Sequence, residues 1–378
     1  MRFEPNEVDL MRRAIELSIL GAGRVEPNPR VGAIVVSPQG EIVGEAYHER
    51  FGAAHAEIEA LRRAGTASEG GTLYVTLEPC SHEGKTPPCT RGILEAGIRR
   101  VVVATRDPNP EASGGVEVLR QRGVQVECGL LAEEAAGANA PFLWWHTTGE
   151  LFLALKLAAS LDGKIAEVPG GRSAVTGAEA LPQVMRLRAA ADAILIGSGT
   201  AAADDPLLTV RDLSVAGRVP TRVVLDSEAR VSLDSRLVRS MDEAPLLLFV
   251  AETADPGRIA RLEAAGAVVE RIPESSTEGR EGRGAGIDIE SVLSRLLDRG
   301  MRSVLCEGGA GLADSLMATG VVQRLHWHLA PRVIGPGGLP ALTGAGIGEW
   351  CLAGSLSAGN DLLIVWDHER LAAVLKGA

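Results

Sequence analysis

The sequence lacks a long hydrophobic run, an excess of positive charge and a secretion signal. No stretch approaches the roughly 18 apolar residues that a membrane-spanning helix needs, and the N-terminal MRFEPNEVDLMRRAIELS carries charges throughout. The net charge of −11 provides no surplus of the cations that neutralise nucleic-acid phosphates. We therefore expect a cytoplasmic protein that binds neither membranes nor nucleic acid.

Cysteine is also scarce, with one residue at each of positions 80, 89, 128, 306 and 351. An odd number of cysteines without a secretion signal argues against a disulfide framework. Each is therefore expected to be a metal ligand or a core residue. Cys128, Cys306 and Cys351 have no ligand pattern around them, so we expect these three to be core or near-surface residues.

The chain is long enough for two domains, because domains usually contain about 100–200 residues and this chain has 378. Strand-like and helix-like segments alternate in both halves, which is typical of α/β architecture. The apolar pattern restarts around WWHTTGELFLALK, so we expect residues 1–147 to form one domain and residues 148–378 another. Strands at VGAIVVSP, TLYVTLEP and RRVVVATRD, between helical segments, predict a three-layer α/β/α sandwich for the first domain.

The second half has strand-like segments at ADAILIGSGT, TRVVLDSE, APLLLFVAE, RSVLCEGG and LHWHLAPRVIG. With shorter helical segments between them, they predict a separate α/β domain. The glycines of Gly197-Ser198-Gly199 follow a strand and could be taken for a Rossmann dinucleotide motif. Pro206, however, interrupts the helix that should hold the pyrophosphate, so the pattern is weak evidence for that fold.

One histidine and two cysteines form the strongest candidate for a metal site. His55 and Glu57 begin a helix-like segment, Cys80 ends the apolar strand TLYVTLEPC, and Cys89 begins another helix. One nitrogen and two sulfur ligands suit a tetrahedral zinc ion with a fourth position open to water, as in catalytic zinc sites. Zinc lowers the pKa of bound water from about 15.7 toward about 7, and Glu57 would then carry the proton.

The order of these residues matches the signature of zinc nucleobase deaminases, H-x-E followed by P-C-x-x-C. Here the two cysteines are separated by SHEGKTPP instead of two residues. Pro87 and Pro88 suit a helix entry, and a helix N-terminus favours the thiolate form of Cys89. Two rival functions are a deaminase fused to a non-catalytic binding domain, and an interaction module with a structural zinc. Closed structural sites normally supply four protein ligands, which counts against the second rival.

Longer motifs resemble the bifunctional deaminase–reductase family of riboflavin biosynthesis. They are PNPRVG at 27–32, HAE at 55–57, EPCSHEGKTPPC at 78–89, K-x-x-A-S-L-D-G at 156–163, ADDP at 203–206 and CEGG at 306–309. The resemblance spans nearly the whole chain. It implies a cytidine-deaminase-like three-layer α/β/α domain followed by a dihydrofolate-reductase-like α/β domain. The intact ADDP and CEGG motifs count against a non-catalytic second domain.

The resemblance implies two reactions on one phosphorylated pyrimidine. The first is zinc-dependent deamination of 2,5-diamino-6-ribosylamino-4(3H)-pyrimidinone 5′-phosphate, with Glu57 as the catalytic proton carrier. NADPH then reduces the ribosyl group to a ribityl chain. Asn28 is an expected ring or ribose contact, and His82 and Lys85 are expected to reach the phosphate side as cationic donors. We also expect a homo-oligomer.

The resemblance also implies the contacts in the second half. Those for NADPH are Ala158, Ala174, Thr200, Asp204, Ser227, Gly309, Ala310, Gly311, Leu312, Ala313, Asp314 and Ser315. Those for the substrate are Lys156, Asp162, Arg172, Arg188, Leu208, Arg211 and Glu307. Arg188 and Arg211 are expected to face the phosphate, and Glu307 the sugar hydroxyls. Family members often read S-x-W-I-T where this chain has RSAVT at 172–176, so the usual aromatic cofactor contact is missing at Ala174.

Overall fold

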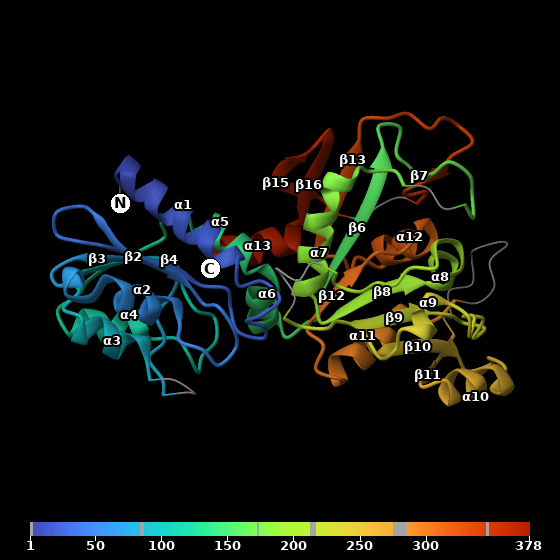
Figure 1. The fold of residues 1–378 in the computed structure, drawn as a ribbon, viewed down its shortest axis with the longest axis horizontal. Helices are drawn as coiled ribbons and strands as arrows, with labels where there is room; N and C mark the ends of the chain where they lie inside the picture. Colours follow the sequence, from blue (N-terminus) through green and yellow to red (C-terminus); the bar gives the residue numbers. More distant parts are fainter. Residues whose placement is uncertain (1–2, 84–86, 172–173, 212–216, 275–285, 345–347) are drawn as a thin grey trace. The chain divides into compact units, whose positions relative to one another are not determined.

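The computed structural model describes residues 3–83, 87–171, 174–211, 217–274, 286–344 and 348–378, and the chain divides into two compact units (Figure 1). The first unit contains residues 1–149 and 371–378, and the second contains residues 150–370. No helix among the described residues is both long enough and apolar enough to cross a bilayer.

A five-stranded sheet forms the middle of the first unit, in the order β2-β1-β3-β4-β5. Strand β1 pairs antiparallel with β2 and β3, whereas β3, β4 and β5 are parallel. The elements are α1 (Pro5–Ile19), β1 (Gly32–Val36), β2 (Ile42–Tyr47), α2 (Ala56–Ala64), the 3-10 helix η1 (Gly65–Ser68), β3 (Thr72–Leu77), α3 (Cys89–Glu95), β4 (Arg100–Thr105), α4 (Gly115–Gln121), β5 (Gln125–Cys128), α5 (Ala132–Ala138) and α6 (Ala140–Thr148).

Helices cover both faces of this sheet (Figure 1). On one face, Met11 of α1 packs in a cluster with Ile34 of β1 and Val102 of β4. On the other face, residues of α2, α3 and α4 pack in a second cluster with Val35 and Val103 of the same two strands. Successive side chains of a strand point to opposite faces, so strands covered on both sides need apolar residues throughout. The predicted three-layer α/β/α arrangement is therefore confirmed.

The end of the chain belongs to the first unit, although the sequence analysis assigns all of residues 148–378 to one domain. Helix α13 (Glu369–Gly377) buries Leu371 and Leu375. The carbonyl oxygen of Ala378 accepts a hydrogen bond from Arg106 N at 3.4 Å. A short amphipathic helix has an apolar stripe that fits many partners, so the pattern alone did not specify where it packs.

A nine-stranded sheet runs through the second unit, in the order β11-β10-β9-β8-β12-β6-β13-β16-β15. The strands from β11 to β13 in this order are parallel, and β16 and β15 continue the sheet antiparallel. The elements are β6 (Phe152–Ser160), β7 (Lys164–Ala166), the 3-10 helix η2 (Ala178–Ala180), α7 (Leu181–Ala190), β8 (Ala193–Gly197), α8 (Ser198–Asp204), β9 (Thr221–Leu225), α9 (Arg236–Arg239), β10 (Leu246–Ala251), α10 (Pro256–Ala264), β11 (Val268–Ile272), α11 (Ile289–Asp298), β12 (Ser303–Cys306), α12 (Ala310–Thr319), β13 (Arg324–Ala330), β14 (Leu339–Pro340), β15 (Trp350–Ala358) and β16 (Asp361–His368). The strands predicted for this half are present as β8, β9, β10, β12 and β13.

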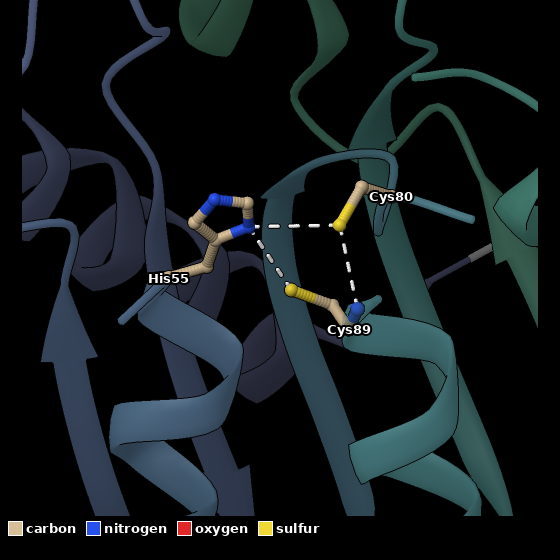
Figure 2. A group of neighbouring side chains, drawn as sticks. All are labelled: His55, Cys80 and Cys89. Atoms are coloured by element: carbon tan, nitrogen blue, oxygen red, sulfur yellow. Dashed lines mark hydrogen bonds between the residues drawn. The ribbon is translucent and has the colours of Figure 1, made fainter. Parts of the chain in front are cut away.

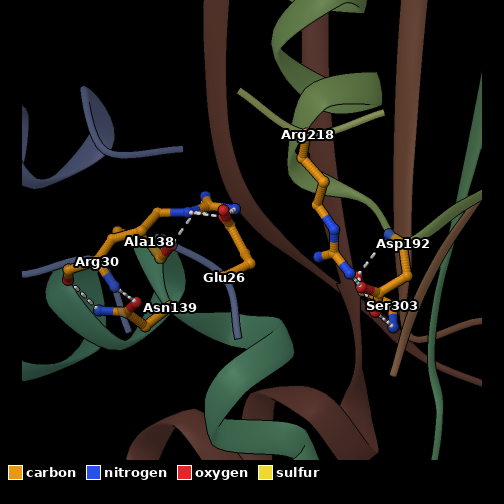
Figure 3. A network of polar contacts seen from close by, with 7 residues as sticks. All are labelled: Glu26, Arg30, Ala138, Asn139, Asp192, Arg218 and Ser303. Carbon is orange, nitrogen blue, oxygen red and sulfur yellow. Dashed lines mark hydrogen bonds and ion pairs between the residues drawn. The ribbon is translucent and has the colours of Figure 1, made fainter. Parts of the chain in front are cut away.

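Asp192 joins three neighbouring strands of this sheet where they begin (Figure 3). Its Oδ2 atom accepts hydrogen bonds from Arg302 N and Ser303 N, both at 2.8 Å, and from Ser303 Oγ at 3.1 Å. Its carboxylate also forms an ion pair with Arg218, and its carbonyl oxygen accepts from Thr221 N at 3.0 Å. One residue therefore aligns the starts of β8, β9 and β12.

Replacing Asp192 by alanine should lower the free energy of unfolding of the second unit by about 2–4 kcal/mol, because several buried donors lose their acceptor. Urea denaturation followed by tryptophan fluorescence measures this loss. Asp192→Asn keeps one acceptor oxygen, so its free energy of unfolding should fall by less. Asp234→Ala is the control, since this exposed carboxylate pairs with Arg239 on the surface, where ion pairs contribute little. Equal losses in the two alanine variants would contradict the assigned role.

Candidate functional site

Three candidate metal ligands meet at the ends of three elements of the first unit (Figure 2). His55 is the residue before α2, Cys80 lies shortly after the end of β3, and Cys89 is the first residue of α3. The His55 Nδ1 atom lies 3.2 Å from Cys89 Sγ and 3.6 Å from Cys80 Sγ. In the described part of the chain, this is the only group of three or more such side chains whose ligand atoms gather within 4.8 Å.

A buried carboxylate holds the Cys80 loop in position. Glu78 is 4% exposed, and its Oε1 atom accepts hydrogen bonds from Gly114 N and Val116 N, both at 3.0 Å, at the start of α4. Glycine is required at 115 by this close approach, because a Cβ there would lie 1.7 Å from the Pro79 carbonyl oxygen. Sequence reasoning missed Glu78 as a support, although an acidic residue at the end of a buried strand was a usable signal.

The donor set fits a zinc ion. The hydrogen bond from Cys89 lowers the pKa of Cys80 to about 4, with burial opposing it, and the same contact raises the pKa of Cys89 well above its usual value. The hydrogen bond to Cys80 also raises the pKa of His55. These shifts arise because the three side chains share protons, and a bound dication would replace those protons.

Glu57 lies on the first turn of α2 and is 3% exposed. Its Oε2 atom is buried without a hydrogen-bond partner among the described residues. Burial raises the pKa of Glu57, with the nearby His55 opposing this effect. A carboxyl group that takes and gives a proton near neutral pH needs a pKa raised in this direction. The geometry therefore suits the predicted proton carrier.

His48 is a site residue that sequence reasoning missed. Its ring packs edge-on against that of His55, with centroids 5.3 Å apart, and its Nε2 atom lies 3.4 Å from Asn28 Nδ2. Burial lowers the pKa of His48, which favours the uncharged ring. The available signal was a histidine directly after the strand that ends at Tyr47. Asn28, predicted as a substrate contact, is thus linked through His48 to the candidate metal ligand His55.

A polar clamp fixes the turn that carries Asn28 (Figure 3). The Asn139 side chain forms two hydrogen bonds with the backbone of Arg30. Its Oδ1 atom accepts from Arg30 N and its Nδ2 atom donates to Arg30 O, each at 2.7 Å. The Arg30 guanidinium donates to Glu26 Oε1 at 3.0 and 3.1 Å. Arg30 is therefore engaged within the protein. Of the remaining predicted residues in this unit, His82 is exposed and Lys85 lies outside the described residues.

In the second unit, Glu307 directly follows β12 and pairs with Arg188 of α7. Arg188 Nε donates to Glu307 Oε1 at 2.6 Å and Arg188 Nη2 donates to Oε2 at 2.9 Å, while Nη1 donates to the Thr209 carbonyl oxygen at 3.2 Å. Burial opposes the charge of Glu307, but Arg188 and then Lys156 lower its pKa. Burial lowers the pKa of Lys156 on β6. Three predicted substrate residues are thus together.

Two predicted cofactor segments also meet. The Gly309 amide, at the start of α12, donates to Thr200 Oγ1 of α8 at 2.8 Å. A Cβ at Gly309 would lie 3.1 Å from that oxygen. In the same helix, Asp314 Oδ1 accepts a hydrogen bond from Thr343 N at 2.8 Å, so the Asp314 side chain already binds the loop that contains Thr343. Ala158 and Ser227 are partly buried, and Ala174 is exposed.

The segment that follows α8 has an unusual backbone. Asp205 and Leu208 have positive φ angles of 39° and 54°, a region that non-glycine residues rarely adopt. Arg222 of β9, with no exposed surface, supports this segment by donating to the Leu207 carbonyl oxygen at 3.3 Å and to Ser240 Oγ at 2.7 Å. Such strain persists only where the surroundings hold it, and it is common at functional sites.

The other predicted substrate residues differ in what they contact. Asp162 accepts from Ser160 Oγ at 2.6 Å, Ile334 N at 3.0 Å and Gly335 N at 2.7 Å. These bonds lower the pKa of Asp162 and place its carboxylate in a turn. Arg211 is exposed. Arg172 lies outside the described residues.

Comparison with known proteins matches both units to described families. Residues 5–105 match the cytidine and deoxycytidylate deaminase zinc-binding region, and residues 151–364 match the RibD C-terminal domain. The chain is 40% identical over 333 residues to the riboflavin biosynthesis protein RibD of Bacillus amyloliquefaciens, covering 88% of this chain and 86% of that protein. It is 39% identical over 337 residues to the RibD protein of Escherichia coli, covering 86% and 88%.

A solved structure agrees over almost the whole chain. The diaminohydroxyphosphoribosylaminopyrimidine deaminase/5-amino-6-(5-phosphoribosylamino)uracil reductase of Thermotoga maritima superposes with a TM-score of 0.76 at 34% identity, covering 96% of this chain and 98% of that one. The predicted family and fold class, a cytidine-deaminase-like unit followed by a reductase unit, are therefore confirmed.

The purified protein should contain about one zinc ion per chain, bound by one nitrogen and two sulfur atoms at roughly 2.0–2.3 Å. Metal analysis gives the stoichiometry, and X-ray absorption spectroscopy gives the ligands. Cys80→Ser should strongly reduce the zinc content, whereas Cys351→Ser, which replaces an exposed cysteine, should not. A fourth protein ligand, or equal zinc loss in both variants, would rule out an open catalytic site at these residues.

Proposed function

The chain belongs to the RibD family of bifunctional deaminase–reductases in riboflavin biosynthesis, and we propose how its own residues carry out the two reactions. The proposed substrate is 2,5-diamino-6-ribosylamino-4(3H)-pyrimidinone 5′-phosphate, which loses an amine in the first unit and is reduced at the ribosyl group in the second. The observation that best supports the first step is the convergence of three metal-ligand atoms beside Glu57, a buried carboxylate with a partnerless oxygen.

His55, Cys80 and Cys89 would hold the zinc ion, which when bound makes water a nucleophile at neutral pH. Glu57 accepts a proton from the attacking water and delivers it to the ring nitrogen. It then carries a second proton, from the new hydroxyl group, to the amine, which departs as ammonia. Its place two residues after His55 keeps it close to the reacting atoms, and its burial raises its pKa toward the working range. Asn28 would hydrogen bond the pyrimidine, and His48, whose ring nitrogens lie 3.1 Å from the Ala54 carbonyl oxygen and 3.4 Å from Asn28 Nδ2, would orient the Asn28 side chain.

The rival in which zinc only stabilises the first unit fits these residues less well. A closed structural site normally has four protein ligands, and the described residues bring three together. A structural site also has no use for a buried carboxylate with an unpaired oxygen, which costs about 1–3 kcal/mol of desolvation. Catalysis explains the unpaired Glu57 oxygen, for which the described residues provide no hydrogen bond.

For the second step, we propose that NADPH supplies the hydride and that Lys156 donates the proton that the opened ribose needs. Burial already lowers the pKa of Lys156, which makes it a better acid than an exposed lysine. Glu307, fixed by Arg188, is placed to accept hydrogen bonds from sugar hydroxyls. Because the Arg188 guanidinium is engaged by Glu307 and Thr209, its role is to orient Glu307, and Arg211 is the better candidate for the phosphate.

The remaining cofactor contacts are proposed for Ala158, Ala174, Ser227 and the start of α12. The Gly309–Thr200 contact supports a phosphate site there, because amides at a helix N-terminus suit an anion. A cytoplasmic location and a homo-oligomeric state remain predictions.

Glu57→Gln should retain zinc but slow ammonia release by at least about a hundredfold, because the amide keeps the shape of the side chain and cannot carry a proton. Ammonia release and zinc content are measured on the same preparation. Glu59→Gln is the matched control two positions along α2, where the carboxylate pairs with Arg62 and Arg63 at the surface. Normal ammonia release by Glu57→Gln would show that another group carries the proton.

Gly309→Asp should weaken NADPH binding about tenfold or more, because the added side chain crowds Thr200 and places a negative charge beside the phosphates. Arg211→Ala should instead weaken the phosphorylated substrate by roughly 1.5–3 kcal/mol and leave NADPH affinity unchanged. Titration of each ligand separates the two effects, and continued deamination checks folding of the first unit. Loss of the same ligand in both variants would refute the proposed placement.

A further inference from the structure

Four ionisable side chains lie on one face of the second unit's sheet. Strand β6 carries Lys156, and β13 carries His326 and His328, with His326 paired directly opposite Lys156 in the parallel register. In the parallel pairing of β12 with β6, Cys306 lies opposite Leu155. Glu307, the next residue, therefore lies at the level of Lys156. The leucines of β6 on either side of Lys156 point into the core on the other face. Strand alternation therefore puts all four polar side chains on the same side.

The Lys156 amine has no strong partner of its own in this cluster. Among the described residues, no hydrogen bond or close ion pair involves it, although Glu307 acts on it electrostatically. Both oxygens of Glu307 are engaged by Arg188, at 2.6 and 2.9 Å. A lysine side chain is long and flexible and has three donors to place. An acceptor beside Lys156 is needed if the amine is to be held in one direction.

His328 offers that acceptor. It is 1% exposed, and its Nδ1 atom is buried with no hydrogen-bond partner among the described residues. Burial, and after it the charge of Lys156, lowers the pKa of His328 to about 3, so the ring is uncharged at neutral pH. An uncharged imidazole has one nitrogen that accepts a hydrogen bond. A buried polar atom without a partner costs about 1–3 kcal/mol, which is unusual unless function requires it.

We propose that His328 is a positioning residue of the reductase site: a rotamer change of the flexible Lys156 side chain brings its ammonium to the unpaired Nδ1 atom of His328, which then accepts a hydrogen bond and holds that group toward the ribose. His328 is the diagonal neighbour of Lys156 across β6 and β13, a separation that long side chains can span. The inference rests on the proposed role of Lys156 as proton donor. It adds a residue that neither the sequence motifs nor the Arg188–Glu307 pair includes.

His326 does not offer the same contact, although it lies on the same strand and face. The charge that affects it most is that of Arg324, which is itself paired with Asp367 at 2.6 and 2.9 Å. His326 is 8% exposed and has no unpaired buried atom of the kind found in His328. It is therefore a matched control for burial, residue type and strand position.

The test measures reduction of the pre-deaminated substrate by the full-length protein as a function of pH. His328→Phe removes the acceptor and keeps a ring, and should lower kcat about tenfold or more, as expected for a lost hydrogen bond to a charged group, with a smaller change in KM. That bond favours the protonated amine, so its loss should move the alkaline limb of kcat to lower pH. His328→Asn, whose Oδ1 can replace Nδ1 as acceptor, should recover part of the rate and of the limb position. His326→Asn should behave as the unmodified protein.

Two further measurements keep the outcomes distinct. Ammonia release by the first unit and NADPH binding by the second show that each variant is folded. Lys156→Met should abolish reduction; if it does not, the proposed proton donor is wrong. If Lys156→Met is inactive but His328→Phe retains kcat and its alkaline limb, or His328→Asn recovers nothing, the inference about His328 alone is overturned.

Discussion

The charge on two buried carboxylates is the constraint on which both sites depend. A carboxylate taken out of water must be matched by donors or a cation, or its burial costs several kcal/mol. Glu78 is matched by two backbone amides at the start of α4, which ties the end of β3 to that helix and thereby fixes the loop of Cys80. Glu307 is matched by the Arg188 guanidinium, which ties the end of β12 to α7. In each unit, a strand that ends in a buried acid therefore brings a helix to the site.

Other buried polar atoms lack hydrogen-bond partners of this kind. Among the buried side-chain atoms without a hydrogen-bond partner in the described residues are Glu57 Oε2 and His328 Nδ1, and each lies beside a group on which the proposed reaction of its unit depends. Such atoms are rare in folded proteins because they lower stability. The two units thus use the same arrangement: a fully bonded carboxylate sets the geometry, and an unpaired neighbour remains available to the chemistry.

The sequence predicted those features that are encoded locally. His55, Cys80 and Cys89 stand in a motif, and the buried strands were visible as apolar runs. The fold class was therefore predicted correctly, and the three candidate metal ligands do lie together. Features that depend on contacts with other parts of the chain were not predicted. His48 has no motif, and its role follows from its packing against His55. Glu78 opens the motif at 78–89, but its supporting role follows from bonds to the backbone amides of residues 114 and 116. Arg188 was expected to face a phosphate, yet its partner is a carboxylate 119 residues away. The short helix α13 has a stripe that fits many surfaces, so its place with the first unit depends on tertiary contacts.

In the proposed function, one chain performs two reactions in order on one phosphorylated pyrimidine, each at its own site. The most direct measurement is to incubate the purified protein with the diaminopyrimidine ribosyl phosphate, with and without NADPH, and to follow ammonia, NADPH and products together. Without NADPH, we expect ammonia and a deaminated ribosyl product. With NADPH, we expect one NADPH to be oxidised for each ammonia released. NADPH oxidation without ammonia release, or ammonia release that never leads to NADPH oxidation, would contradict the proposed function.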